Sequence, residues 1–187
     1  MDGIRKVTAL TVSAVMLLTS SCAAKKEEEL IKEYDEDTLV GFLEEELDID
    51  EDDIYITDSE DAEIRVPDGV NITCPYGRAR LNAFIFEDED DARNVFEDYY
   101  DMFEDTFNVN DQFEGDYDEE FEDDYGYITL EGDNAGTTIF GDRYMYGGIC
   151  GGIYYTGHMV ILIYPEGPDA RHDVEDLIDA FGYPYAD

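Results

Sequence analysis

The sequence predicts a single α+β domain, a mostly antiparallel sheet with about three helices packed on it. Two observations predict this class. Three segments carry apolar side chains at helical spacing, whereas the other segments are β-rich and follow one another across turn residues instead of alternating with helices. The 187 residues are enough for one hydrophobic core, and nothing in the chain indicates a second domain.

The first helix is predicted over residues 37–47, with Asp37 as its N-terminal cap. One stripe of this segment is apolar: Leu39, Val40, Leu43 and Leu47. Short strands are predicted next, separated by turn signals, over residues 54–57, 64–66, 70–74 and 81–86. Pro75 cannot donate a ladder hydrogen bond, so we expect it at a strand end or a sheet edge.

The longest helix is predicted from residue 88 to residue 107, and it opens with acidic residues that the helix dipole favours. Its apolar stripe is bulky, which indicates a helix packed on the core: Ala92, Val95, Phe96, Tyr99, Phe103 and Phe107. Residues 108–124 are the most acidic part of the chain. Aromatic residues recur there at every fourth position, at Phe113, Tyr117, Phe121 and Tyr125. Two alternatives stay open for this segment, a short helix lying on the domain or a loop held by its aromatic side chains.

The C-terminal third is β-rich until a closing helix. Strands are predicted over residues 125–132 and 137–141. The longest nearly uncharged stretch after residue 33 is Arg143–Pro165, predicted to be a β-hairpin with Thr156-Gly157 at its turn. The closing helix is predicted to begin at Pro168 and to stop at Gly182.

The predicted hairpin has two different faces. A two-residue turn at Thr156-Gly157 would pair Tyr155 with His158 and Cys150 with Ile163. Since side chains alternate along a strand, Cys150 and His158 then lie on opposite faces and cannot form a nucleophilic pair. The face expected under the helices carries Ile149, Ile153, Val160 and Leu162. The opposite face carries the tyrosines expected to bind a partner, Tyr144, Tyr146 and Tyr154.

The N-terminus has the features of an export signal. Arg5 and Lys6 precede an apolar run, Val7–Leu18, that is too short to span a bilayer as a stable helix. The run ends in Leu18-Thr19-Ser20-Ser21-Cys22, which resembles the lipobox of bacterial lipoproteins. The alternative is an ordinary secretory signal with an incidental cysteine.

The resemblance implies that Cys22 carries the lipid, palmitate included, and becomes the mature N-terminus. It predicts a signal peptide over residues 1–21, a charged tether over 22–34 and an acidic α+β domain over 35–187. The predicted location is the extracytoplasmic face of the cell membrane, with the membrane as a partner through the lipid on Cys22.

The net charge of the chain excludes some classes of binding partner. The net charge is −39, and the first 33 residues contain five basic and five acidic residues, so residues 34–187 carry all of it. Such a surface repels phosphate backbones, so we expect no nucleic-acid partner. It favours cations, cationic peptides or simply solubility in salt.

Four further features have competing interpretations. Cys74 and Cys150 are either a disulfide that an exported domain could keep or two buried hydrophobic residues. Arg78 and Arg80 indicate local ion pairs in preference to an anion-binding loop. Asp48-x-Asp50-x-Asp52 and Asn108-x-Asn110-x-Gln112 begin like calcium loops, but Asp53 and Phe113 stand where such a loop needs glycine.

No catalytic residue, metal ligand or cofactor is predicted, because no Ser/His/Asp arrangement, zinc-type cluster or phosphate loop is present in the sequence. We therefore expect a non-enzymatic binding or accessory module with a tyrosine-lined sheet face for a glycan, a peptide or a cationic partner. A calcium-dependent structural domain is the alternative, followed by an enzyme without a recognisable motif.

Overall fold

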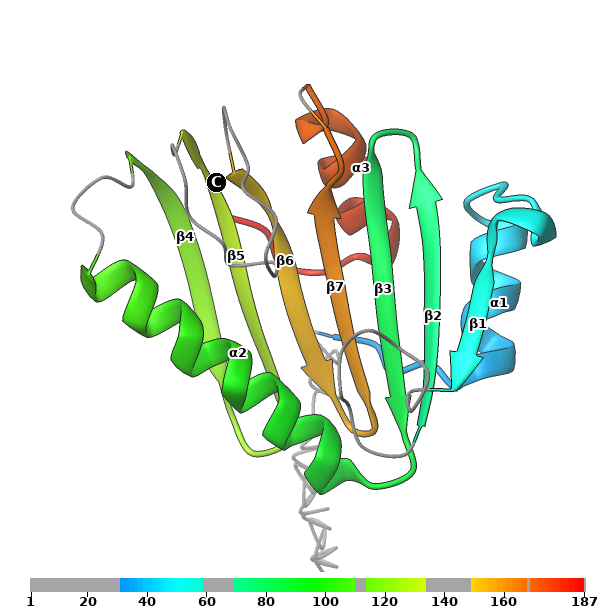
Figure 1. The fold of residues 1–187 in the computed structure, drawn as a ribbon, viewed down its shortest axis with the longest axis horizontal. Helices are drawn as coiled ribbons and strands as arrows, with labels where there is room; N and C mark the ends of the chain where they lie inside the picture. The colour runs from blue at the N-terminus through cyan, green and yellow to red at the C-terminus, as the bar shows by residue number, and fades with distance from the viewer. Residues whose placement is uncertain (1–30, 59–68, 110–113, 134–148, 168, 187) are drawn as a thin grey trace, which may run out of the picture.

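The computed structural model describes residues 31–58, 69–109, 114–133, 149–167 and 169–186, and these form one α+β domain (Figure 1). The helices within them are α1 (Glu36–Glu45), the short 3-10 helix η1 (Glu51–Asp53), α2 (Glu89–Val109) and α3 (Arg171–Phe181). The strands are β1 (Tyr55–Asp58), β2 (Gly69–Tyr76), β3 (Ala79–Phe86), β4 (Glu114–Phe121), β5 (Tyr125–Asp133), β6 (Ile149–Thr156) and β7 (Met159–Pro165). They make one antiparallel sheet in the order β1-β2-β3-β7-β6-β5-β4, which confirms the predicted fold class.

The second arm of the predicted hairpin, β7, is the central strand of this sheet. It pairs with β6 on one side and with β3 on the other, from Ala79 opposite Pro165 to Ile85 opposite Met159. All seven of its residues are buried. Burial on both faces explains why this segment is a continuous apolar run, MVILIYP, and does not alternate with polar residues.

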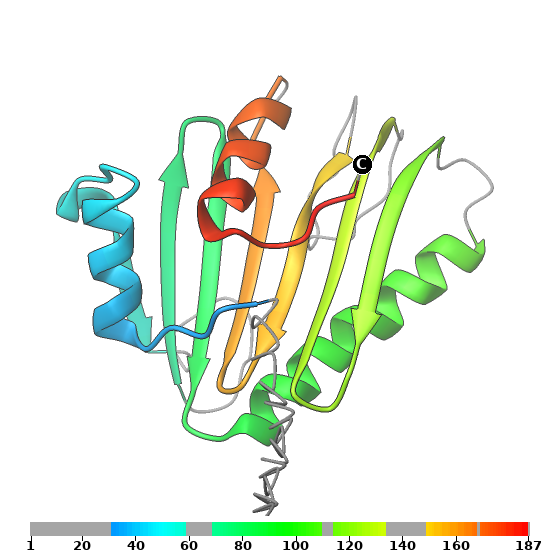
Figure 2. The ribbon, with the colours of Figure 1, turned by 180° about the vertical axis from the view of Figure 1, so that it is seen from behind.

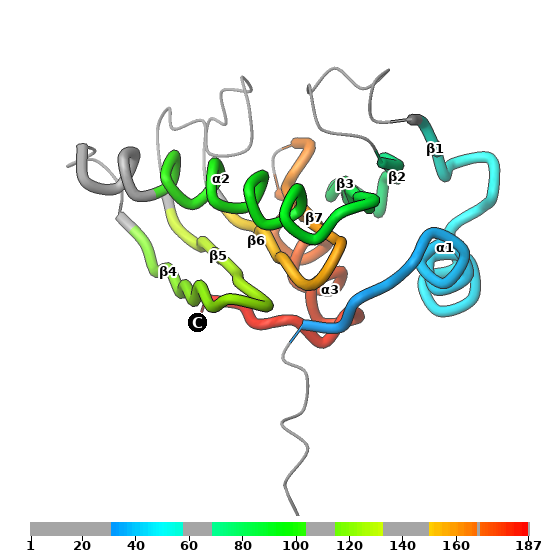
Figure 3. Tube along the Cα trace, turned by 90° about the horizontal axis from the view of Figure 1, so that it is seen from below, coloured from blue at the N-terminus to red at the C-terminus, as the bar shows by residue number. Residues whose placement is uncertain are grey.

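The helices cover the two faces of the sheet unequally. Helix α2 crosses one face alone, here named the α2 face (Figure 1). The opposite face, named the α3 face, is covered by α1, α3 and a C-terminal tail, Tyr183–Ala186 (Figure 2). The view along the sheet shows α2 on one side and α3 on the other (Figure 3). Each face has its own buried apolar cluster, so the sheet separates two cores.

Two helix ends differ from the prediction by a few residues. Asp35, not Asp37, caps α1, since its side chain accepts a hydrogen bond from the Thr38 N–H at 2.8 Å. The closing helix begins at Arg171, three residues after Pro168. It stops where predicted, because Gly182 takes the left-handed conformation with φ +69 that glycine adopts readily.

Part of the acidic segment 108–124 is strand β4, which neither predicted alternative included. The fourth-position spacing of its aromatic residues fits a strand, because residues four apart share a face in a strand as well as in a helix. Tyr117 and Phe121 both point to the α2 face, with ring centroids 5.6 Å from Phe103 and 5.2 Å from Phe96 respectively. Periodicity alone therefore did not separate the two conformations.

The hairpin forms, but its register is two residues away from the predicted one. Thr156 pairs with Met159 and Gly152 with Ile163, so the turn residues are Gly157 and His158. Gly157 has φ +51, a conformation that favours glycine at this first turn position. A shift of two residues preserves the faces, so Ile153, Val160 and Leu162 do lie under α2 as predicted.

The predicted tether over residues 22–34 is wrong at its C-terminal end. Residues 31–34, named the N-terminal strap, belong to the folded domain: Ile31 is 2% exposed and Tyr34 is 4% exposed. The Tyr183 hydroxyl donates to the Lys32 carbonyl at 2.8 Å, which joins the strap to the C-terminal tail. The domain therefore includes Ile31. In the described part of the chain, no helix combines the length and hydropathy that a membrane span requires.

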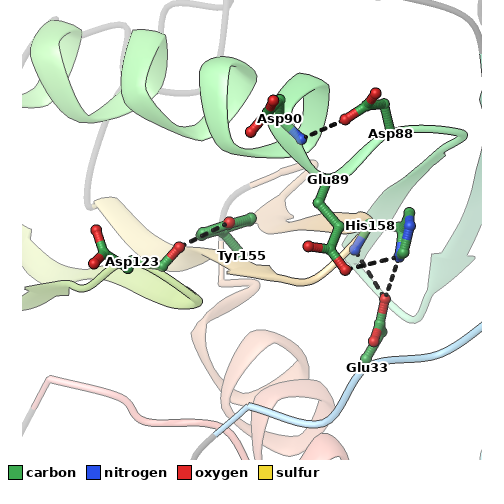
Figure 4. Close-up of polar contacts among 7 residues, drawn as sticks. All are labelled: Glu33, Asp88, Glu89, Asp90, Asp123, Tyr155 and His158. Carbon is green, nitrogen blue, oxygen red and sulfur yellow. Dashed lines mark hydrogen bonds and ion pairs between the residues drawn. The ribbon is translucent and has the colours of Figure 1, made fainter.

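A polar contact also holds the strap to the hairpin turn (Figure 4). Glu33 accepts a hydrogen bond from the His158 backbone N–H at 2.8 Å, and its Oε1 lies 3.1 Å from His158 Nδ1. Glu89, in the first turn of α2, places its Oε1 3.9 Å from the same Nδ1 atom (Figure 4). A Cβ at Gly157 would meet the Glu33 carboxylate, so a side chain there would displace Glu33 from the turn, and the positive φ angle favours glycine independently.

Candidate functional site

The structure removes Tyr154 from the predicted binding face. Tyr154 lies on the α3 face as predicted, yet its side chain is 0% exposed. Its hydroxyl donates to the Pro184 carbonyl at 2.8 Å, and its ring centroid is 4.7 Å from that of Tyr183. Because the C-terminal tail covers it, Tyr154 is a core residue and cannot contact a ligand. Tyr144 and Tyr146, like the lipidation residue Cys22, lie outside the described residues.

Cys74 and Cys150 form no disulfide with each other. Cys74 in β2 and Cys150 in β6 are free and buried on the α3 face. Strands β3 and β7 lie between them, which sets the two backbones about 14 Å apart, beyond the reach of a disulfide. Burial raises the pKa of Cys74 to about 12 and that of Cys150 to about 11, so both remain thiols at neutral pH.

The paired arginines form the predicted local ion pairs. Arg80 Nε lies 2.6 Å from Glu166 Oε1, and Arg78 lies 3.8 Å from Asp169. Both acidic partners come from the loop between β7 and α3. These pairs connect the end of the β2–β3 hairpin to that loop, and Asp173 strengthens the connection by accepting from the Arg78 N–H at 2.7 Å.

The calcium hypothesis receives no support from the described residues. They contain no group of three or more His, Cys, Asp or Glu side chains placed to hold a metal ion, and Asp48, Asp50 and Asp52 are among them. The second loop considered, residues 108–112, lies mostly outside the described ranges. His158 is engaged by carboxylates at the hairpin turn, and His172 lies 3.4 Å from Asp176 on an exposed face of α3.

Among the described ranges, parts of both sheet faces have no helix over them: α2 does not reach β1 and β2 on its face (Figure 1), and the far edge of the α3 face is also without one. On the α3 face, α3 packs against β3, β7 and β6, and the tail continues across the sheet toward β5, so β4 at the far edge has no described helix over it (Figure 2). The side chains that β4 and β5 present there are named the β4–β5 patch: Asp116, Asp118, Glu120, Tyr125 and Tyr127. Within the described residues, this patch is one of the sheet surfaces that no helix covers.

Strand pairing brings the tyrosines and carboxylates of the patch together. Glu120 is opposite Tyr127 in the ladder, and Asp118 is opposite Thr129. The Tyr127 hydroxyl donates diagonally to Asp118 Oδ2 at 3.1 Å. Tyr125, at the turn end of β5, makes the equivalent diagonal hydrogen bond to Glu120. The result is a short ladder of tyrosine–carboxylate pairs across two strands.

These contacts keep the tyrosine hydroxyls protonated and the carboxylates available as acceptors. The hydrogen bond to Glu120 raises the pKa of Tyr125 to about 12. Burial and then the hydrogen bond to Asp118 raise the pKa of Tyr127 to about 12. Asp116 and Asp118 are exposed, Glu120 and Tyr125 are half-buried, and Tyr127 is only 7% exposed. A ligand could therefore contact charged hydrogen-bond acceptors, the carboxylates, beside the ring of Tyr125.

Sequence reasoning expected a tyrosine-lined face with tyrosines from the hairpin, and it did not select the tyrosines of β5. The signal was present: Tyr125 and Tyr127 alternate in a predicted strand directly after the acidic segment. What was missing was the strand character of residues 114–121, which brings Asp118 and Glu120 beside them.

Comparisons with protein-family models, with curated proteins and with solved structures each found no match. The geometry of the described residues therefore carries the functional argument.

Proposed function

We propose that this protein is a lipid-anchored extracytoplasmic binding module that is not an enzyme. The anchor rests on the sequence, a basic start and an apolar run that end at Cys22. Only eight residues separate Cys22 from Ile31, the first residue of the N-terminal strap. Fully extended, they reach about 30 Å, so a lipid on Cys22 would hold the domain close to the bilayer.

The binding surface in this proposal is the β4–β5 patch, and one observation carries it. It is a sheet face without a helix over it, and it presents the exposed carboxylates of Asp116 and Asp118 beside the half-buried pair of Tyr125 and Glu120. Carboxylates accept hydrogen bonds from amines, guanidinium groups and hydroxyls, and a tyrosine ring offers apolar contact area at small entropic cost. A partner with donor groups in an extended arrangement fits this chemistry.

Lipidation can be tested by growing cells that express the full chain with an alkyne-labelled fatty acid. We expect label on the wild-type chain and none on Cys22→Ser, while Cys74→Ser keeps the label. Unlabelled wild-type protein that is released into the medium would support the ordinary secretory signal instead.

Binding at the patch can be tested with the double variant Asp118→Asn/Glu120→Gln. The matched control is Glu97→Gln/Asp98→Asn, which removes the same charge from exposed positions on α2. In a screen of cationic peptides and neutral oligosaccharides, we expect the patch variant to lose a ligand that the control keeps. Equal binding by both variants would exclude the patch as the binding surface.

A further inference from the structure

We propose that the free edge of β4 binds an extended cationic peptide as an additional strand of the sheet. This inference rests on the proposed function and identifies the partner of the same surface. Strand β4 ends the sheet, and within the described residues it pairs with β5 alone. On an edge strand, every second residue directs its N–H and C=O groups away from the sheet, where a peptide backbone can pair with them.

The length of β4 suits such a partner. Its eight residues extend about 27 Å, enough to pair with a segment of six to eight residues. The other edge strand, β1, has only four residues. A strand as short as β1 would form few hydrogen bonds with an added peptide. Peptide addition is therefore more favourable at β4.

The side chains of β4 specify the charge of the partner. Asp116, Asp118 and Glu120 alternate along the α3 face, two residues apart. No ion pair joins any of the three to a basic side chain within the described residues. A paired strand places its side chains about 5 Å from those directly opposite, so lysines or arginines at every second position would meet these carboxylates.

The same acids make a second copy of this chain a poor partner. Two β4 edges would bring like charges opposite each other, which destabilises the pairing, and the net charge of −39 adds long-range repulsion. The opposite face of β4 offers an apolar contact, because Tyr117 is 52% exposed there. The expected ligand therefore alternates, with basic residues toward the α3 face and apolar or β-branched residues toward Tyr117.

The test uses the full chain and a labelled eight-residue peptide in which lysine alternates with valine and threonine. Binding is followed by fluorescence anisotropy at physiological salt, and protection of the β4 amides by hydrogen exchange. We expect saturable binding and slower exchange in β4. The variant Asp118→Asn/Glu120→Gln should bind about tenfold more weakly, as loss of two exposed charge pairs implies, whereas Glu97→Gln/Asp98→Asn should bind normally.

Two peptide controls separate strand addition from plain charge attraction. The first is N-methylated at alternate amides, so that it keeps its charge and loses the backbone donors for the ladder. The second has the same composition with its lysines adjacent in sequence. We expect both to bind much more weakly than the alternating peptide. Equal binding of all three would overturn strand addition and leave only a charged surface.

The outcomes also separate this inference from the proposed function. An oligosaccharide of N-acetylglucosamine that binds wild type and not the patch variant, with no peptide binding, would overturn the cationic-peptide proposal and support the patch. If neither probe binds and the β4 amides are unchanged, both proposals fail together.

Discussion

The two halves of the α3 face carry the same residue type with opposite outcomes. Tyr154 in β6 is directly opposite Tyr127 in β5, and both rings point to this face. Tyr154 is covered by the C-terminal tail and donates to Pro184, whereas the buried Tyr127 and the half-buried Tyr125 donate to carboxylates of β4. The difference in burial between Tyr154 and Tyr125 shows that coverage by a distant segment, and not the local pattern, decides how far a tyrosine of this face is exposed.

The half of the α3 face that carries Tyr154, here named the inner half, is covered by segments from the beginning and from the end of the described domain. Tyr34 of the N-terminal strap, Phe42 of α1 and Phe181 of α3 form one aromatic cluster with Tyr183, with ring centroids 4.7 to 5.7 Å apart. Among the described residues, no helix covers the outer half, formed by β5 and β4, and β4 carries charged residues at alternate positions. Acidic side chains both keep this edge hydrated and deter pairing with another copy.

The sharpest test of this comparison replaces one tyrosine in each half by alanine. Tyr154→Ala should lower the free energy of unfolding by about 3–5 kcal/mol, because it leaves a cavity between β6 and the tail. Tyr125→Ala should lower it by about 1 kcal/mol or less, since the side chain is only half-buried. Urea unfolding measures both. Similar losses for the two variants would contradict the division into halves.

The next largest effect tests whether the strap belongs to the core. Ile31→Ala should destabilise the domain by about 2–4 kcal/mol, as removal of a fully buried aliphatic side chain does. Lys32→Ala, at the neighbouring exposed position, should change stability by less than about 0.5 kcal/mol. If Ile31→Ala is as mild as Lys32→Ala, residues 31–34 are part of the tether after all.

A smaller effect isolates the hydroxyl that holds the tail. Tyr154→Phe removes the hydrogen bond to Pro184 and leaves that buried carbonyl without its donor, which should cost about 1–2 kcal/mol. Tyr125→Phe removes a hydroxyl whose partner Glu120 can turn to water, so its loss should be within about 0.5 kcal/mol. Thermal unfolding of the two variants beside wild type gives the comparison.

The smallest expected effect is that of Tyr127 ionisation on the free energy of unfolding, and it appears only at alkaline pH. Tyr127 keeps its proton up to a folded-state pKa of about 12, whereas an unfolded tyrosine ionises near 10.0. A raised pKa stabilises the fold fully below the unfolded value, so this contribution should be lost as pH rises from about 10 to about 12. Tyr127→Phe should reduce the pH dependence of stability over that interval, and an unchanged profile would argue against a raised pKa for Tyr127 in the folded state.

The pH at which each tyrosine ionises also distinguishes Tyr154 from Tyr125 on the α3 face. Burial raises the pKa of Tyr154 well above its usual value, so Tyr154 should ionise only when the domain unfolds. Tyr125 should ionise in the folded state, with a pKa of about 12 that falls toward 10.0 in Glu120→Gln, because that carboxylate is the main cause of the shift. Tyrosinate absorbance during an alkaline titration reports both.

Much of the fold was predictable from the sequence, because it depends on local pattern. The apolar stripe of α2, the Gly182 stop of α3 and the uniformly apolar β7 each reflect a short-range rule. The faces of the hairpin were also correct although its register was not, since a two-residue shift leaves alternation unchanged. The ion pairs of Arg78 and Arg80 followed from the excess of carboxylates around any basic side chain.

The candidate site was decided by tertiary structure. Residues 114–121 satisfy helical and strand spacing equally, and pairing with β5 selects the strand. Tyr154 was assigned to a binding face because no local signal shows that residues 183–186 return across the sheet. The sequence by itself determined the α+β class, the acidic surface and the faces of the central strands. Only long-range packing determined which end of a tyrosine-lined face is covered, because burial depends on segments far apart in the chain.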